Sequence, residues 1–129
     1  MFFYAKFRVG FNHINCNGEL TNTGLLSILE EAAEMHSAKI GLGLNDFNLT
    51  GLSWALINWK LNFITRCRHG EVLTIKTWAR HTSKISSYRD FEVYDSNDNL
   101  LAIATSKWVL IDIFKKSMIK IDSNLIRKI

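Results

Sequence analysis

The chain has 129 residues, enough for one domain that buries about two thirds of its unfolded surface. Hydrophobic residues make up 47% and charged residues 22%, a balance typical of globular proteins that argues against disorder. No stretch approaches the roughly 18 apolar residues of a membrane span, and residues 1–4 are too short for a signal peptide. We therefore expect one cytoplasmic domain over residues 1–129, with Cys16 and Cys67 as free thiols.

The net charge of +4 is concentrated in two parts of the chain. Residues 60–89 carry many basic side chains against the single acid Glu71, and the last fifteen or so residues carry several more. Such a surface attracts an acidic protein or a phosphorylated ligand, or it is a solvated strand face that keeps the protein in solution. No recognition-helix, RNP-like or zinc-finger pattern accompanies the charge, so we expect no nucleic acid partner.

The first part of the chain predicts a strand and then a loop. Residues 4–9 alternate well enough between apolar and polar side chains to form a strand. Residues 10–22 are polar and rich in Asn and Gly, which is typical of a loop. At its end Thr21 or Asn22 can cap a following helix.

Residues 23–40 have apolar side chains at helical spacing, and Gly41 and Gly43 end this predicted helix. The wide apolar face consists of Leu25, Leu29, Ala32, Ala33, His36 and Ile40, flanked by Leu26, Ile28 and Met35. The opposite, polar stripe consists of Ser27, Glu30, Glu31, Glu34 and Ser37. An apolar face of this width predicts a helix that is largely enclosed.

Four long strands are predicted after Gly51, over residues 53–65, 72–80, 85–94 and 100–113. They exceed the usual length of about 5–6 residues, which suits strands that bend around another element. In the first of them one face is predicted to hold Ala55, Ile57, Trp59, Leu61 and Phe63. After Phe114 we expect an extended tail or a short helix.

The element order β-α-β-β-β-β predicts an α+β hotdog fold, in which a curved antiparallel sheet wraps around one long central helix. Such sheets usually pair edge to edge across a two-fold axis, which removes an exposed edge. We expect a homodimer or homotetramer.

Several segments resemble the acyl-ACP thioesterase family, over roughly residues 5–129. They are LEEAAEMH at 29–36, WALINW at 54–59, GEVLTIKTW at 70–78, RDF at 89–91 and ATSKWV at 104–109. The resemblance implies an acyl-thioester hydrolase that releases a fatty or other acyl group from acyl-ACP or acyl-CoA, without a cofactor. A non-catalytic protein that binds acyl groups is the alternative, and a hotdog dehydratase is disfavoured because the loop offers no clear His–acid pair.

The family resemblance places this chain closest to the N-terminal half of tandem enzymes with two hotdog domains. In those enzymes the catalytic Asp-x-Asn-x-His loop belongs to the C-terminal half. Aligned on this chain, that motif falls on Asn15, Asn17 and Glu19, and only Asn17 matches. Asn17 could orient water or the substrate carbonyl, or simply form the turn before Gly18. Glu19 could replace the missing acid or be a turn residue, and Asn15 cannot act as a base but could bind substrate.

The start of the predicted helix offers a second site. Helix N-termini supply N–H donors for an oxyanion, and Gly24 would let a ligand approach the backbone beside Thr23. Matching these two residues to the "GG" helix start of phenylacetate-type acyl-CoA thioesterases, another hotdog branch, places Glu31 on the helical acid of that branch. Glu31 is then the base or nucleophile, or else a solvated glutamate of the polar stripe.

Other reactive side chains have structural interpretations. His36 lies on the apolar face, which favours a packed, hydrogen-bonded histidine over a catalytic one. His13 and Cys16 lie in the loop, but no base is evident beside Cys16. The spacing of His, Cys and Glu residues fits no metal site, so no metal is predicted. The four Trp residues could line an acyl tunnel or simply fill the core.

Overall fold

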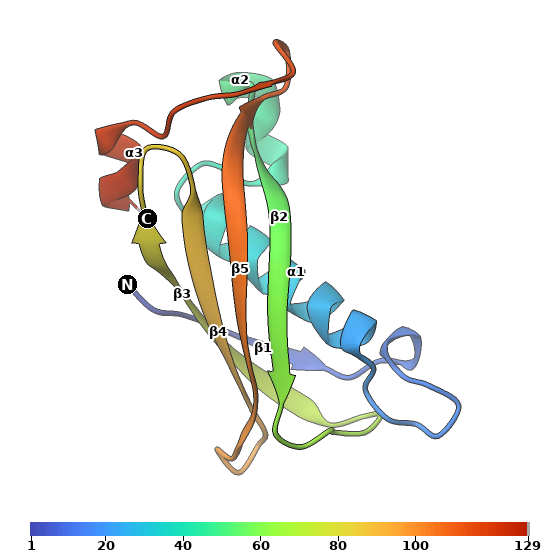
Figure 1. Cartoon of the computed structure of the whole chain (residues 1–129). Helices are drawn as coiled ribbons and strands as arrows, with labels where there is room; N and C mark the ends of the chain where they lie inside the picture. Colours follow the sequence, from blue (N-terminus) through green and yellow to red (C-terminus); the bar gives the residue numbers. More distant parts are fainter. Residues whose placement is uncertain (129) are drawn as a thin grey trace.

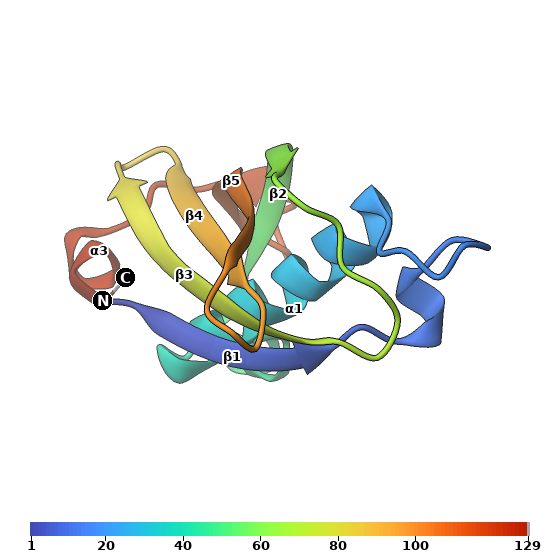
Figure 2. The same ribbon diagram turned by 90° about the horizontal axis from the view of Figure 1, so that it is seen from below.

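The computed structural model describes residues 1–128, which form one curled antiparallel sheet with a long helix on its concave side (Figures 1 and 2). The sheet order is β1-β3-β4-β5-β2, and the two-residue strand β6 adds to β5. The strands are β1 (Phe3–Arg8), β2 (Leu52–Phe63), β3 (Val72–Thr82), β4 (Ser87–Tyr94), β5 (Leu100–Asp112) and β6 (Ser117–Met118). This is the predicted hotdog fold.

Helix α1 (Asn22–Lys39) lies where the sequence predicts it. Thr21 is the cap, because its Oγ1 accepts a hydrogen bond from the Gly24 N–H at 3.0 Å. Past its end, Gly41 adopts a left-handed conformation with φ of 79°. The buried face comprises Gly24, Leu25, Ile28, Leu29, Ala32, Ala33 and His36. Met35, predicted to flank this face, is 39% exposed, and the helix is covered on one side only rather than largely enclosed as predicted.

A bulge in β2 overturns part of the predicted face pattern. The register against β5 shifts between Leu56 and Asn58, so the extra residue Ile57 is half exposed. Because side chains alternate along a strand, one inserted residue reverses the faces on either side of it. Trp59 packs on the core after the bulge, together with Leu61 and Phe63. Before it, Trp54 and Leu56 rather than Ala55 face the pocket described below.

The β3–β4 hairpin also differs from prediction at its turn. Strand β3 continues to Thr82, and β4 begins at Ser87 rather than at Ile85. The hydroxyl of Ser83 accepts hydrogen bonds from the backbone N–H groups of Ile85 and Ser86, each at 3.2 Å. This Ser-centred turn holds Ile85 away from the ladder.

The remaining segments are short. The 3₁₀ turn η1 (Phe11–His13) follows β1, while η2 (Leu44–Asp46) and α2 (Phe47–Thr50) connect α1 to β2. The tail contains β6 and the helix α3 (Ser123–Lys128), so it combines the two predicted possibilities. Among residues 1–128, no helix has the length and apolar character needed to cross a membrane.

Candidate active site

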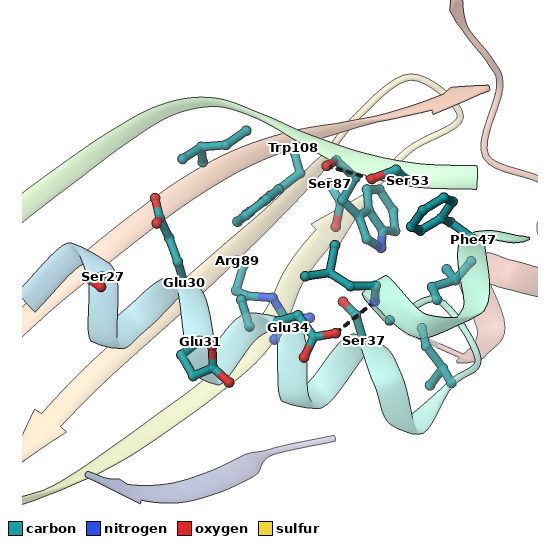
Figure 3. A pocket seen from close by; sticks show the side chains of 17 residues that line it. Ser27, Glu30, Glu31, Glu34, Ser37, Phe47, Ser53, Ser87, Arg89 and Trp108 are labelled. Atoms are coloured by element: carbon teal, nitrogen blue, oxygen red, sulfur yellow. Dashed lines mark hydrogen bonds between the residues drawn. The ribbon is translucent and has the colours of Figure 1, made fainter. Parts of the chain in front are cut away.

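A pocket of about 460 Å³ lies between α1 and the inner face of the sheet (Figure 3). Its helix wall carries the polar stripe Ser27, Glu30, Glu31, Glu34 and Ser37. Its sheet wall carries Trp54, Leu56, Ser87, Arg89 and Trp108, and Leu44 and Phe47 also line it. Acidic side chains therefore face an aromatic wall across a volume that suits a small ligand.

The helix wall follows from residue spacing. Ser27, Glu31 and Glu34 recur at intervals of four and three, which places them on one ridge of α1. Glu34 is held in place, since its Oε1 accepts a hydrogen bond from the Leu44 N–H at 2.8 Å. Glu30 and Glu31 are exposed and leave the helix in different directions (Figure 3). The predicted acid Glu31 thus lines the pocket.

Arg89 and His36 form a buried pair behind the pocket. Arg89 is 8% exposed, and its Nη1 donates to His36 Nδ1 at 2.8 Å and to Thr77 Oγ1 at 3.2 Å. The His36 ring also stacks on Phe3, with ring centroids 5.1 Å apart. Burial and then the charge of Arg89 lower the pKa of His36 to about 4, while burial lowers the pKa of Arg89 to about 10. The prediction of a packed, hydrogen-bonded His36 is confirmed.

We expect His36 to make the protein less stable in mild acid. Between pH 6.5 and about 4 the unfolded chain binds a proton at this ring and the folded chain does not, so stability falls as pH is lowered through this range. The contribution is of order 3 kcal/mol. Urea unfolding at several pH values would show it as the difference between the wild type and His36→Asn, which keeps an acceptor for Arg89 but does not titrate. A difference that is constant across this range would contradict the expectation.

The helix start is more tightly packed than the sequence suggests. A Cβ atom on Gly24 would lie 2.3 Å from the backbone oxygen of His13, so the glycine makes room for the chain's own loop. The Gly24 N–H is used by the Thr21 cap. Thr23 is exposed, and neither Thr23 nor Gly24 lines the pocket. The oxyanion role of these two residues stays a prediction, and they lie outside the pocket that contains Glu31.

The three residues matched to the catalytic loop lie together before α1. Asn15 Oδ1 accepts from the backbone N–H groups of Asn17 and Glu19, at 2.9 and 3.1 Å, and so shapes its own turn. The carbonyl of Asn17 accepts a hydrogen bond from Arg68, and Glu19 pairs with Arg68 in an isolated β-bridge. None of the three lines the pocket that contains Glu31.

The basic segment 60–89 does not form one free cationic face. Arg66 donates to the carbonyl of Leu20, and Arg68 to that of Asn17, so both anchor the loop before α1. Lys76 pairs with Glu92, and Arg80 pairs with Asp90. Arg89 is buried. Arg66 and Arg68 are exposed and their carbonyl acceptors are neutral, so their charge remains available to an acidic partner. Only Lys76 and Arg80 of this segment form ion pairs with described acids.

Sequence reasoning missed Arg89 as a pocket residue, and it did not single out Trp54 and Trp108 among the four tryptophans that could line a tunnel. Strand β4 alternates strictly between buried and half-buried positions. Arg89 occupies a buried position, two residues before the buried Phe91. The sequence did contain a sign of this position: a charged residue at the same alternating positions as the apolar residues of the strand. The pocket position of Trp54 depends on the β2 bulge, for which the sequence offers no sign.

Comparisons with known proteins identify the family to which this chain is similar. The whole of residues 1–129 matches the model of the acyl-ACP thioesterase N-terminal domain. The chain is 25% identical over 114 residues to the chloroplastic oleoyl-acyl carrier protein thioesterase 1 of Arabidopsis thaliana, covering 83% of this chain and 32% of that protein. It therefore spans about a third of the length of this curated relative.

Two solved structures share the fold. A Lactobacillus plantarum protein, provisionally described as an oleoyl thioesterase, has a TM-score of 0.89 at 24% identity, over 99% of this chain and 50% of that one. A hypothetical Staphylococcus aureus protein in complex with CoA also has a TM-score of 0.89, at 10% identity, over 99% and 81% of the two chains. With the family match over its whole length, the chain belongs to the acyl-ACP thioesterase N-terminal domain family.

Proposed function

We propose that this protein hydrolyses acyl thioesters, releasing a fatty or other acyl group from acyl-ACP or acyl-CoA. The observation that carries the proposal is the pocket between α1 and the sheet, in a member of a thioesterase family. Thioester hydrolysis needs a carboxylate that attacks or activates water, and a cavity that holds the acyl group. The helix wall offers the first, and Trp54, Leu56 and Trp108 offer the second.

Glu31 is the proposed base or nucleophile. Ser27 lies one helical turn before it on the same wall, where its hydroxyl can donate a hydrogen bond to the thioester carbonyl. The oxyanion donors at Thr23 and Gly24, and the polar groups of Asn15, Asn17 and Glu19, remain predictions. They would have to act on a ligand from outside the pocket of the single chain.

The assembly proposed is a homodimer or homotetramer. Strand β2 is twelve residues long, lies at one end of the sheet path and pairs with β5 on one side. A long unpaired edge of this kind is a site for pairing with a second chain. Pairing there would also enclose the pocket, because β2 forms part of its wall.

The carrier proposed is ACP or CoA, in a cytoplasmic step of fatty acid biosynthesis. Two comparisons support it: the Arabidopsis relative is named for an oleoyl-acyl carrier protein, and the S. aureus structure holds CoA.

Hydrolysis of a panel of acyl-CoA and acyl-ACP thioesters tests the proposal. The purified protein, with its mass in solution measured by light scattering, should release free thiol from at least one member of the panel. Thiol release is followed with a chromogenic disulfide, after correction for the protein's own exposed Cys16. A panel that binds without turnover would contradict the hydrolase.

That outcome would support the alternative, a hotdog protein that binds acyl-ACP or other acyl thioesters without catalysis. One observation favours it: Asn15 and Glu19 stand where the family's catalytic loop has Asp and His, and Asn15 shapes its own turn.

A further inference from the structure

Arg89 brings a positive charge to the sheet wall of the pocket. It lies on β4 between Ser87 and Phe91, on the buried face of the strand, and is 8% exposed. It is also one of the pocket-lining residues (Figure 3). Charged side chains are almost never this deeply buried unless they are paired.

The pairing of Arg89 is incomplete. The hydrogen bonds that its guanidinium donates to other described residues both leave from Nη1, toward His36 and Thr77, and neither acceptor carries a negative charge at neutral pH. Within residues 1–128, no carboxylate lies within 4.0 Å of the guanidinium. The other edge of the guanidinium, with Nη2 and Nε, has no protein partner there. A buried cation without an opposite charge is unfavourable, so a ligand that supplies one binds with that advantage.

The acids of the pocket do not fill this role. Glu34 is tied to the Leu44 N–H at 2.8 Å, and Glu30 and Glu31 are exposed on the helix wall. Arg89 is thus the buried charge of the sheet wall, with the aromatic side chains of Trp54 and Trp108 in the same pocket.

We propose that Arg89 binds a carboxylate of the ligand, and that this pocket selects molecules with an acyl body and an anionic end. A guanidinium presents two parallel N–H donors that match the two oxygens of a carboxylate, and the tryptophans pack the aliphatic part. The inference deepens the proposed function by naming its substrate class. The carboxylate comes either from the far end of a carboxyacyl substrate or from the free fatty acid product.

Equilibrium binding tests the subsite without requiring turnover. Octanoate should bind the wild-type protein about tenfold or more tightly than octan-1-ol does. The two dissociation constants are measured by Trp fluorescence or calorimetry at pH 7. Arg89→Met should abolish this preference, and Arg89→Lys should retain part of it as a point charge. The matched control Arg80→Met removes an exposed arginine paired with Asp90 and should keep the full preference.

A measurement on the wild-type protein tests the proposal even if Arg89→Met does not fold. In protein labelled with ¹⁵N-arginine, octanoate should shift one side-chain Nε resonance, and octan-1-ol should not. Equal affinity for the two probes, or a preference that survives in folded Arg89→Met, would overturn the proposal.

A second comparison identifies the source of the carboxylate. If the substrate carries it, suberyl-pantetheine should have a KM about tenfold or more below that of octanoyl-pantetheine, and Arg89→Met should remove the difference. If the product carries it, the two thioesters should have similar KM values while octanoate inhibits competitively. If neither thioester is hydrolysed but octanoate still binds in preference to octan-1-ol, the proposed hydrolase activity is contradicted and the carboxylate subsite is supported.

Discussion

Replacing Glu31 with Gln should reduce kcat for thioester hydrolysis by about 10²–10⁴-fold, with little change in KM. The amide has nearly the size of the carboxylate but can neither accept a proton from water nor attack the thioester. Steady-state hydrolysis of the best substrate in the panel measures the effect. The circular dichroism spectrum should be unchanged, because Glu31 is exposed and the pocket wall keeps its shape.

The neighbouring Glu30 supplies a matched control. It precedes Glu31, is also exposed and lines the same pocket, but leaves the helix in another direction (Figure 3). Glu30→Gln removes the same charge and should change kcat by less than about threefold, since water and salt screen an exposed charge. If Glu30→Gln abolishes hydrolysis and Glu31→Gln does not, the base is Glu30 and the assignment of Glu31 is wrong.

Gly24→Ala should destabilise the protein by about 3 kcal/mol or more, although alanine is the better helix former by about 1 kcal/mol. The added Cβ would lie 2.3 Å from the backbone oxygen of His13, too close for any real contact. The His13 carbonyl cannot move freely, because the Thr21 N–H donates to it at 3.0 Å. Thermal unfolding should show a midpoint lower by about 10 °C or more.

Gly10→Ala controls for the general effect of the substitution. Gly10 has an ordinary φ of −93°, and its new Cβ would lie 3.2 Å from the Asn12 side-chain oxygen, which can rotate away. We expect a change in the free energy of unfolding below about 1 kcal/mol. A Gly24→Ala protein as stable as the wild type would show that helix propensity outweighs packing at the start of α1.

Much of the fold could be predicted because its signals are local. The apolar spacing of α1, the Thr21 cap and the alternation in β4 each depend on neighbours within a few residues. Met35 departs from this rule, because whether a flanking position of a helix is covered depends on how far the sheet curls around it. The exposure of Ile57 was not predictable either, because the register shift that creates the bulge is a property of the pairing of β2 with β5 and not of β2 alone.

The candidate site was predicted in part. Glu31 was singled out by the resemblance of the helix start to that of phenylacetate-type thioesterases, and the structure places it on the pocket wall, while its catalytic role stays a prediction. Asn15, Asn17 and Glu19 are close to one another in the sequence, and the structure keeps them together, but it places them outside the pocket that Glu31 lines. Which segments share a cavity is a long-range property that spacing along the chain does not encode.

By itself, the sequence determined the element order, the helix with its acidic stripe and the membership of a thioesterase family. Only the tertiary structure decided that Arg89 of β4 meets His36 of α1, fifty-three positions away, beside Trp54 and Trp108. The physical reason is that periodicity reports which face of its own element a side chain occupies. The partner across that face, and therefore whether a buried charge is neutralised, is set by the curl and register of the sheet.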